Sequence, residues 1–211
     1  MSSLYPLRFQ PVYQPYVWGG EKIIRHFHRT APPGRYAESW EVSDRPEGMS
    51  VVANGPRAGR TLADVVADWG SDLLGRRVQG RRFPLLIKLI DAAQTLSVQV
   101  HPDDQAAAQF GGEAKTEMWY ALQADPGAFV YNGVVPGADE AAFRAALAAG
   151  RVETLLRRVP VQAGQRIFVP GGRMHAIGAG ALLLEVQQNS NTTYRVHDWN
   201  RRGHDGVPRV L

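Results

Sequence analysis

The chain has 211 residues, 44% of them hydrophobic, and a formal charge of +4. This length predicts one sizeable domain, and no apolar run approaches the roughly 20 residues that a transmembrane helix needs. The first residues contain no apolar signal core, and the chain contains no cysteine, which excludes disulfides and thiolate metal sites. The basic residues are spread along the chain, which disfavours nucleic acid as a partner, and we expect a cytoplasmic protein.

Only three of the 24 basic residues are lysine, namely Lys22, Lys88 and Lys115. Arginine can replace lysine on a solvated surface, but not where a compact point charge or a titratable amine is needed. The three lysines are therefore candidates for such roles, with chance survival as the alternative for each.

The hydrophobic pattern predicts mostly short strands, and the first 56 residues, rich in Gly, Pro and aromatic residues, are typical of short strands and turns. Helices are predicted near 61–75, with Thr61 as N-cap, at 102–110, and as a pair near 138–158 hinged at Gly150. Further strands are predicted at 83–92, 95–102, 116–122, 128–134, 165–170, 181–188 and 192–199. Many short strands with helical inserts predict a mainly β fold, a β-sandwich or jelly roll.

One predicted strand gives a whole face to polar groups. In LSVQVHPDD (96–104), Ser97, Gln99 and His101 alternate with Val98 and Val100. Successive side chains of a strand point to opposite faces, so a hydroxyl, an amide and an imidazole share one face. Gln99 and His101 are therefore candidate metal ligands.

Two further candidate ligands are Glu117, in AKTEMWY, and His175, in GQRIFVPGGRMH. Taken alone, a strand histidine is more often hydrogen-bonded or exposed, and a glutamate at a strand start is usually solvated. The spacing G-x5-P-x-G-x2-H that ends at His175, however, resembles the second cupin motif, with Ala179 in place of its terminal Asn. Gln99, His101 and Glu117 resemble the first cupin motif, and two imidazoles, a carboxylate and an amide oxygen can hold a divalent ion.

Longer stretches make the resemblance specific. YVWGGEKI, ESWEVSDRPEG, FPLLIKLIDAAQTLSVQVHPDD, KTEMWYAL and VPGGRMHAIGAGALLLEVQQNSNTTYRVHDWNR resemble the type I mannose-6-phosphate isomerase family in its shorter bacterial form. The resemblance implies a cupin jelly-roll barrel, with a single catalytic domain over 1–211 and helical inserts near 61–75 and 138–158. It also implies that the second, smaller cupin domain usual in the family is absent.

The same resemblance implies the chemistry of the site. It implies one zinc ion per chain, for which other divalent ions could substitute, held by Gln99, His101, Glu117 and His175. It implies catalytic roles for Arg195, Lys115, Glu185 and Lys88, and substrate binding by Ser97, Lys88, Lys115 and Arg195. The implied reaction interconverts mannose 6-phosphate and fructose 6-phosphate through an enediolate.

The residues leave several alternatives open. Glu185, inside LLLEV, is the first candidate for the base because burial could raise its pKa, and a buried ion pair is an equally good interpretation. Asn191 and His197 stand where many relatives have Asp and Tyr. Two alternative functions remain open. One is another metal-dependent cupin enzyme, such as an oxygenase or a decarboxylase, and the other is a non-catalytic sugar-phosphate-binding cupin. We expect a phosphorylated hexose as substrate, no nucleic-acid or membrane partner, and an exposed apolar face through which a homodimer could form.

Overall fold

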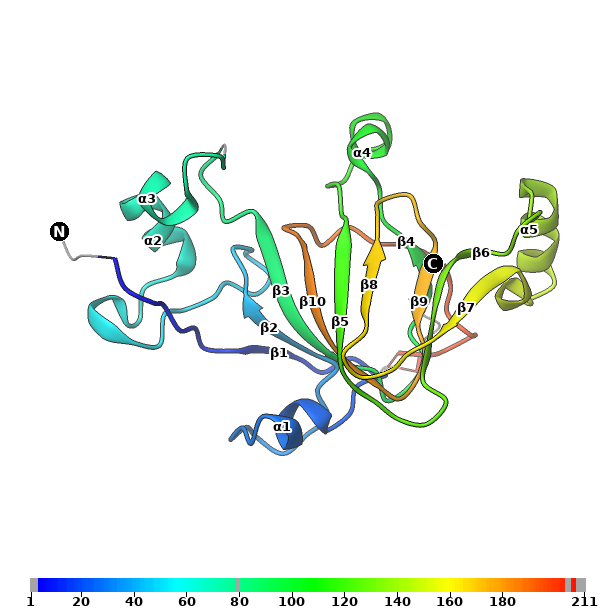
Figure 1. The fold of residues 1–211 in the computed structure, drawn as a ribbon, viewed down its shortest axis with the longest axis horizontal. Helices are drawn as coiled ribbons and strands as arrows, with labels where there is room; N and C mark the ends of the chain where they lie inside the picture. The colour runs from blue at the N-terminus through cyan, green and yellow to red at the C-terminus, as the bar shows by residue number, and fades with distance from the viewer. Residues whose placement is uncertain (1–3, 79, 204–205, 208–211) are drawn as a thin grey trace.

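The computed structural model describes residues 4–78, 80–203 and 206–207, so residues 1–3, 79, 204–205 and 208–211 of the predicted domain lie outside the described residues. The described strands form two antiparallel sheets that stand opposite each other, with helices around them (Figure 1). The mainly β, jelly-roll type of fold predicted from the sequence is confirmed. No helix in the described ranges is long and apolar enough to cross a membrane.

The two sheets each contain strands from both halves of the chain. The first has the order β1 (Val12–Gln14), β2 (Glu38–Val42), β3 (Leu85–Asp91), β10 (Ala181–Gln188), β5 (Glu117–Ala124) and β8 (Arg166–Val169). The second has the order β11 (Tyr194–His197), β4 (Val98–Val100), β9 (His175–Ile177), β6 (Phe129–Val134) and β7 (Leu156–Pro160).

The helices lie outside the sheets: α1 (Lys22–His26), α2 (Leu62–Trp69), α3 (Ser71–Leu74), α4 (Asp104–Phe110) and α5 (Glu140–Ala148), with 3-10 turns η1 (Gly55–Arg57) and η2 (Val152–Leu155). Thr61 caps α2 through a capping box with Asp64, as its sequence predicts.

The expected helical pair near 138–158 is only half correct. After α5 the chain makes the η2 turn, and residues from Leu156 onward form β7, because they pair with β6 and tertiary pairing overrides a local helical pattern.

The register of the first sheet aligns four inward-facing side chains. Lys88 on β3 is opposite Glu185 on β10, and Glu185 is opposite Trp119 on β5. On the other side Lys88 is opposite Trp40 on β2. Residues opposite each other in an antiparallel pair share a face, so the four side chains form a row, Trp40–Lys88–Glu185–Trp119, on the inner face of the sheet.

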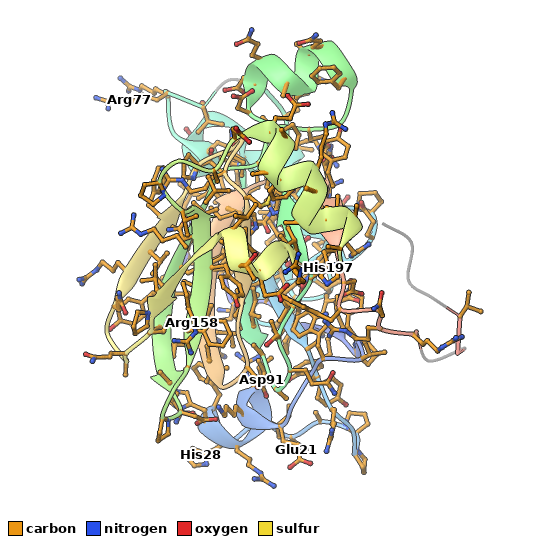
Figure 2. All side chains as sticks on the ribbon, turned by 90° about the vertical axis from the view of Figure 1, so that its right-hand side faces the viewer. Glu21, His28, Arg77, Asp91, Arg158 and His197 are labelled. Carbon is orange, nitrogen blue, oxygen red and sulfur yellow. The ribbon has the colours of Figure 1, made fainter. Side chains whose placement is uncertain are left out.

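Apolar side chains flank this row between the sheets, and helices cover parts of the outer surfaces. The largest buried cluster lies between the sheets and includes Trp18, Ile90, Leu96, Trp119, Val130 and Ile177. The Ile23 side chain of α1 packs outside the first sheet against Leu89 and Leu182, at the end of the molecule where Figure 2 labels Glu21 and His28. The Trp40–Lys88–Glu185–Trp119 row therefore borders the apolar core.

Gly171 lies where the loop after β8 meets the loop after β4. A Cβ atom on Gly171 would lie 2.7 Å from Asp103 Cα and 2.9 Å from Pro102 O. Gly171 is not among the glycines with positive φ, so the constraint is one of space alone. This close approach brings the segment that carries His101 against the segment that carries His175.

We expect Gly171→Ala to lower the free energy of unfolding by about 1–3 kcal/mol, because an added methyl group must push two backbone segments apart. Gly34→Ala is the control, since the nearest atom to its Cβ is the Tyr36 hydroxyl at 3.7 Å. Urea denaturation of both variants measures the difference. Equal stability of the two would mean that the loops can separate at no cost.

Candidate metal centre and active site

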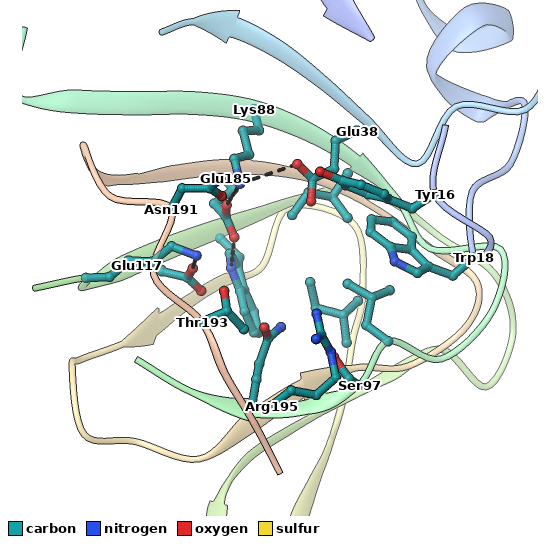
Figure 3. Close-up of a pocket in the computed structure, with 16 residues that line it drawn as sticks. Tyr16, Trp18, Glu38, Lys88, Ser97, Glu117, Glu185, Asn191, Thr193 and Arg195 are labelled. Carbon is teal, nitrogen blue, oxygen red and sulfur yellow. Dashed lines mark hydrogen bonds and ion pairs between the residues drawn. The ribbon is translucent and has the colours of Figure 1, made fainter. Parts of the chain in front are cut away.

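A pocket of about 350 Å³ opens between the two sheets (Figure 3). The first sheet contributes Glu38, Lys88, Glu117 and Glu185, and the second contributes Gln99 and Arg195. Ser97 precedes β4, and Asn191 and Thr193 come from the segment that connects β10 to β11. All seven predicted site residues other than the two histidines line this one pocket, namely Lys88, Ser97, Gln99, Lys115, Glu117, Glu185 and Arg195.

The two predicted histidines meet Glu117 at the inner side of the pocket. One ligand atom from each of His101, Glu117 and His175 lies within 4.8 Å of the others, and all three residues are buried. His101 Nε2 lies 3.1 Å from Glu117 Oε1, and His175 Nε2 lies 3.7 Å from Glu117 Oε2. Tetrahedral metal–ligand bonds of about 2.0–2.2 Å would place neighbouring ligand atoms about 3.3–3.6 Å apart. The separations therefore fit a divalent cation.

The hydrogen bonds of His175 and Glu117 leave one inner atom of each residue available to a cation. His175 Nδ1 donates to Arg173 O over 2.8 Å, which fixes the tautomer and leaves a lone pair on Nε2. His175 Nε2 and Glu117 Oε2 are buried and have no hydrogen-bond partner in the described part of the chain. A buried polar atom without a partner is costly, and a bound cation would satisfy both atoms.

Burial also keeps the two imidazoles in the form that binds metals. Desolvation lowers the pKa of His101 to about 4, although the Glu117 carboxylate acts in the opposite direction. Desolvation likewise lowers the pKa of His175. Desolvation of Glu117 opposes its ionisation, but the Lys115 charge and the His101 hydrogen bond outweigh it and hold its pKa well below the usual range. Neutral imidazoles and a carboxylate are the protonation states that metal binding requires.

Gln99 and Lys115 adjoin this group from two sides. Gln99 is the Cα partner of His175 in the β4–β9 pair and of Arg195 in the β4–β11 pair, so its side chain is on their face of the sheet. Lys115 Nζ lies 2.7 Å from Glu117 Oε1 and 3.2 Å from His101 Nε2. The metal-ligand candidates and one of the two buried lysines are thus neighbours.

Backbone hydrogen bonds hold the three ligand-bearing segments together. Lys115 N donates to Pro102 O over 2.9 Å, and Gly172 N donates to His101 O over 2.8 Å. Gly171 N donates to Thr116 Oγ1 over 3.1 Å. These bonds tie the loops after β4 and β8 to the start of β5, which pre-forms the site.

The second buried lysine belongs to the Trp40–Lys88–Glu185–Trp119 row. Lys88 Nζ lies 3.4 Å from Glu38 Oε2 and 3.5 Å from Glu185 Oε1 (Figure 3). Trp119 Nε1 donates to Glu185 Oε2 over 2.8 Å, and Trp40 Nε1 donates to Glu38 Oε2 over 2.7 Å. Both carboxylates are therefore oriented by an indole and share one ammonium.

The row contains a carboxyl group that can exchange a proton near neutral pH. Desolvation, followed by the charge of Glu117, raises the pKa of Glu185 to about 7. Burial disfavours the Lys88 ammonium, but the carboxylates of Glu38 and Glu185 outweigh this effect and raise its pKa. Lys88 thus stays charged beside a carboxyl group that can gain or lose a proton, a pairing typical of general acid–base sites.

Sequence reasoning missed several pocket residues. Glu38 was not singled out, although its alternation with the outward Ser39 and Glu41 on β2 carried the signal of an inward charge. Tyr16 and Trp18 form a wall beside Ser97 and Arg195 (Figure 3). Both aromatics lie in YVWGGEKI, but no spacing rule assigns them to a site, and only the tertiary structure brings them to the pocket.

A family model described as "Phosphomannose isomerase type I, catalytic domain" matches residues 6–132. The chain belongs to the type I phosphomannose isomerase family. Lys88, Gln99, His101, Lys115 and Glu117 lie inside the matched residues, whereas His175, Glu185 and Arg195 follow them.

Proteins similar to this chain cover nearly all of it. It is 42% identical over 207 residues to a protein of Streptococcus mutans named mannose-6-phosphate isomerase. The crystal structure of the mannose 6-phosphate isomerase from Bacillus subtilis has a TM-score of 0.89 and 38% identity, and covers 98% of this chain. A mannose 6-phosphate isomerase described as bound with zinc and yttrium shares the fold, with a TM-score of 0.66 at 20% identity over 90% of this chain and 70% of that one. The chain spans 65% of the length of the first two relatives.

We expect this chain to bind one divalent ion, and His101→Ala or His175→Ala to abolish tight binding, because each removes one of the buried candidate ligands. Elemental analysis of the purified proteins, followed by titration with Zn²⁺ after chelation, measures this. His28→Asn is the control, since His28 is exposed, lies in the α1 region and has a positive φ that Asn tolerates. Full metal content in both histidine variants would contradict the assignment.

Proposed function

We propose that the protein is an aldose–ketose isomerase that interconverts mannose 6-phosphate and fructose 6-phosphate through an enediolate. The observation that carries the proposal is the union, in one pocket, of a buried His/Glu/His group with a buried glutamate whose pKa is about 7. Such an isomerisation needs stabilisation of an enediolate and a base that works at neutral pH. The name of the Streptococcus mutans relative supports mannose 6-phosphate as one member of this pair.

We propose zinc as the resident ion, with Gln99, His101, Glu117 and His175 as its ligands. Nitrogen and oxygen donors of this kind suit zinc in catalytic sites, and the structure described as zinc-bound supports the choice. When bound there, the ion supplies Lewis-acid stabilisation of the negative charge that develops on the substrate oxygens. Lys115, 2.7 Å from Glu117, adds a fixed positive charge at the same place.

The proton transfer falls to Glu185 in this proposal. Its carboxylate removes the proton from C2 of the aldose and returns it to C1, while the hydroxyl proton on O2 is transferred to O1. Trp119 orients the Glu185 carboxylate through a hydrogen bond of 2.8 Å. Lys88, 3.5 Å from the same carboxylate, stabilises its ionised form and the enediolate. A transfer of this kind typically contributes about 10²–10⁴-fold to the rate.

Binding of the substrate phosphate is assigned to the other end of the pocket. Arg195 Nε lies 3.3 Å from Ser97 Oγ, so a guanidinium and a hydroxyl can act on one anion. Tyr16 and Trp18 border this end, and their rings can pack against the carbon face of a sugar. The pocket then holds a sugar phosphate with its carbonyl end toward His101, Glu117 and His175.

We expect the protein with bound Zn²⁺ to convert mannose 6-phosphate to fructose 6-phosphate in a coupled assay. The kcat/KM should fall as the pH falls through the raised pKa of Glu185, because only the carboxylate form is a base. Glu185→Gln should lose about 10²-fold or more in kcat and lose this acid limb of the profile. Glu21→Gln, on exposed α1 surface, should keep both.

Two results of that assay would count against the proposal. No turnover by the metal-loaded wild type would favour a non-catalytic sugar-phosphate-binding cupin. An acid limb that survives in Glu185→Gln would assign the base to another group.

A second prediction concerns the choice of an amide at position 99. Gln99→Glu would add a negative charge beside Glu117, which strengthens cation binding but opposes the developing enediolate charge. We expect metal affinity that is equal or higher, together with a loss of at least about tenfold in kcat, which is about 1.4 kcal/mol of barrier. Zn²⁺ titration and steady-state kinetics measure the two effects.

The control for that variant is Gln123→Glu, which adds the same charge on an exposed site of β5. A Gln99→Glu enzyme with tighter metal binding and unchanged kcat would remove the charge argument.

We further propose that residues 1–211 act as one cupin-type catalytic domain. The homodimer and the cytoplasmic location stay predictions.

A further inference from the structure

The segment that connects β10 to β11 has two faces. Its even-numbered side chains contact the chain at residues 111–113, directly after α4. Ser190 Oγ donates to Glu113 O over 2.9 Å, Glu113 N donates to Thr192 Oγ1 over 3.0 Å, and the Tyr194 hydroxyl donates to Gly111 O over 3.0 Å. The alternation is that of an extended strand, although only β11 (Tyr194–His197) continues into a sheet.

The odd-numbered residues of the same segment face the substrate pocket. Asn191, Thr193 and Arg195 all line it, and Figure 3 shows them along one side of the pocket. The position of this wall therefore depends on the contacts of the opposite face. At Gly112 the fit is close, because a Cβ atom there would lie 2.8 Å from Thr192 Cγ2.

A buried arginine outside the pocket ties this arrangement to the rest of the fold. The side chain of Arg45, which is only 9% exposed, lies in the loop after β2. Its Nη1 donates to Glu113 Oε2 over 2.7 Å and to Asn189 O over 2.9 Å, and its Nη2 donates to Glu47 Oε1 over 2.9 Å. One guanidinium thus joins both of the segments that make the wall.

Glu113 completes the clamp on the wall segment. Its Oε2 accepts from Arg45 and, more weakly, from Asn191 N over 3.4 Å. Its main-chain N and O bind Thr192 and Ser190 at the same time. Neither Arg45 nor Glu113 lines the pocket. Any effect of the pair on the reaction must therefore pass through the wall.

We propose that Arg45 and Glu113 are positioning residues that hold Asn191, Thr193 and Arg195 in place to bind the substrate. The proposal rests on the proposed isomerase function, since the wall is read as the binding side for the sugar phosphate. The two residues act on substrate binding, whereas the metal group and Glu185 are held by strand pairings and hydrogen bonds that involve neither Arg45 nor Glu113. Arginine is required here because only its planar fork can serve three acceptors in fixed directions.

The test compares Arg45→Lys and Glu113→Gln with the wild type in the mannose 6-phosphate assay. Lysine keeps the charge but loses the fork, and glutamine keeps the shape and the main-chain bonds but loses the charge. We expect KM to rise about tenfold, equal to about 1.4 kcal/mol of binding free energy, with kcat changed by less than about twofold. Zinc content should stay at the wild-type level. Hydrogen exchange of the peptide that covers residues 189–195 should become faster in both variants.

The matched control is Arg29→Lys. Arg29 makes an equally forked contact, with Nη1 and Nη2 at 2.8 and 2.9 Å from the Glu41 carboxylate, but outside the first sheet and away from the pocket. We expect its KM and the exchange of residues 189–195 to match the wild type. If Arg45→Lys does not fold, Glu113→Gln decides the question by the same readouts.

The outcomes separate this inference from the proposed function. A wild-type protein without isomerase activity would remove the proposed function, and the inference with it. An active wild type with unchanged KM in both variants would overturn the inference alone. A fall in kcat and stability that Arg29→Lys shares would also overturn it, because the role would then be structural only.

Discussion

The register between β3, β10 and β5 is the constraint on which the site depends. It sets Lys88, Glu185 and Trp119 side by side, with Trp40 of β2 completing the row. A slip of one residue would turn all these side chains to the outer face, since the side-chain period of a strand is two. Such a slip is costly, because it would turn the charges of Lys88 and Glu185 toward the outer face, where Leu89 and Leu182 pack with Ile23.

The row explains how so many ionisable groups can lie in one core. A single buried charge is very costly, whereas charges that share partners offset the loss of water. Lys88 faces Glu38 and Glu185, and Lys115 faces Glu117, so each of the three pocket carboxylates of the first sheet has an ammonium close by. The second sheet then adds neutral groups, His101 and His175, that can complete a cation site without further charge. The division between a charged sheet and a largely neutral one places a candidate cation site beside a carboxyl group that can exchange a proton near neutral pH.

Local sequence patterns predicted the elements whose tertiary contacts favour the same secondary structure. Alternation predicted the strands around Lys88, Glu117 and Glu185. Capping predicted the helix that Thr61 begins, and spacing predicted the order of the two cupin-like motifs. The segment after Gly150 was predicted as helix and is a 3-10 turn followed by β7, since its pairing with β6 lies outside any local window. Glu38 and Arg45 were not singled out because each takes its role from residues more than 40 positions away.

The sequence by itself determined the chemical inventory: three lysines among 24 basic residues, a polar strand face at 96–101, and the ligand types in cupin order. These follow from residue identity and from the period of a strand, which are local properties. Only the tertiary structure decided that Lys88 lies beside Glu38 and Glu185, that Glu185 has a raised pKa, and that a buried Arg45 holds the pocket wall. Distances and dielectric surroundings arise from packing between segments far apart in the chain, and no local pattern encodes them.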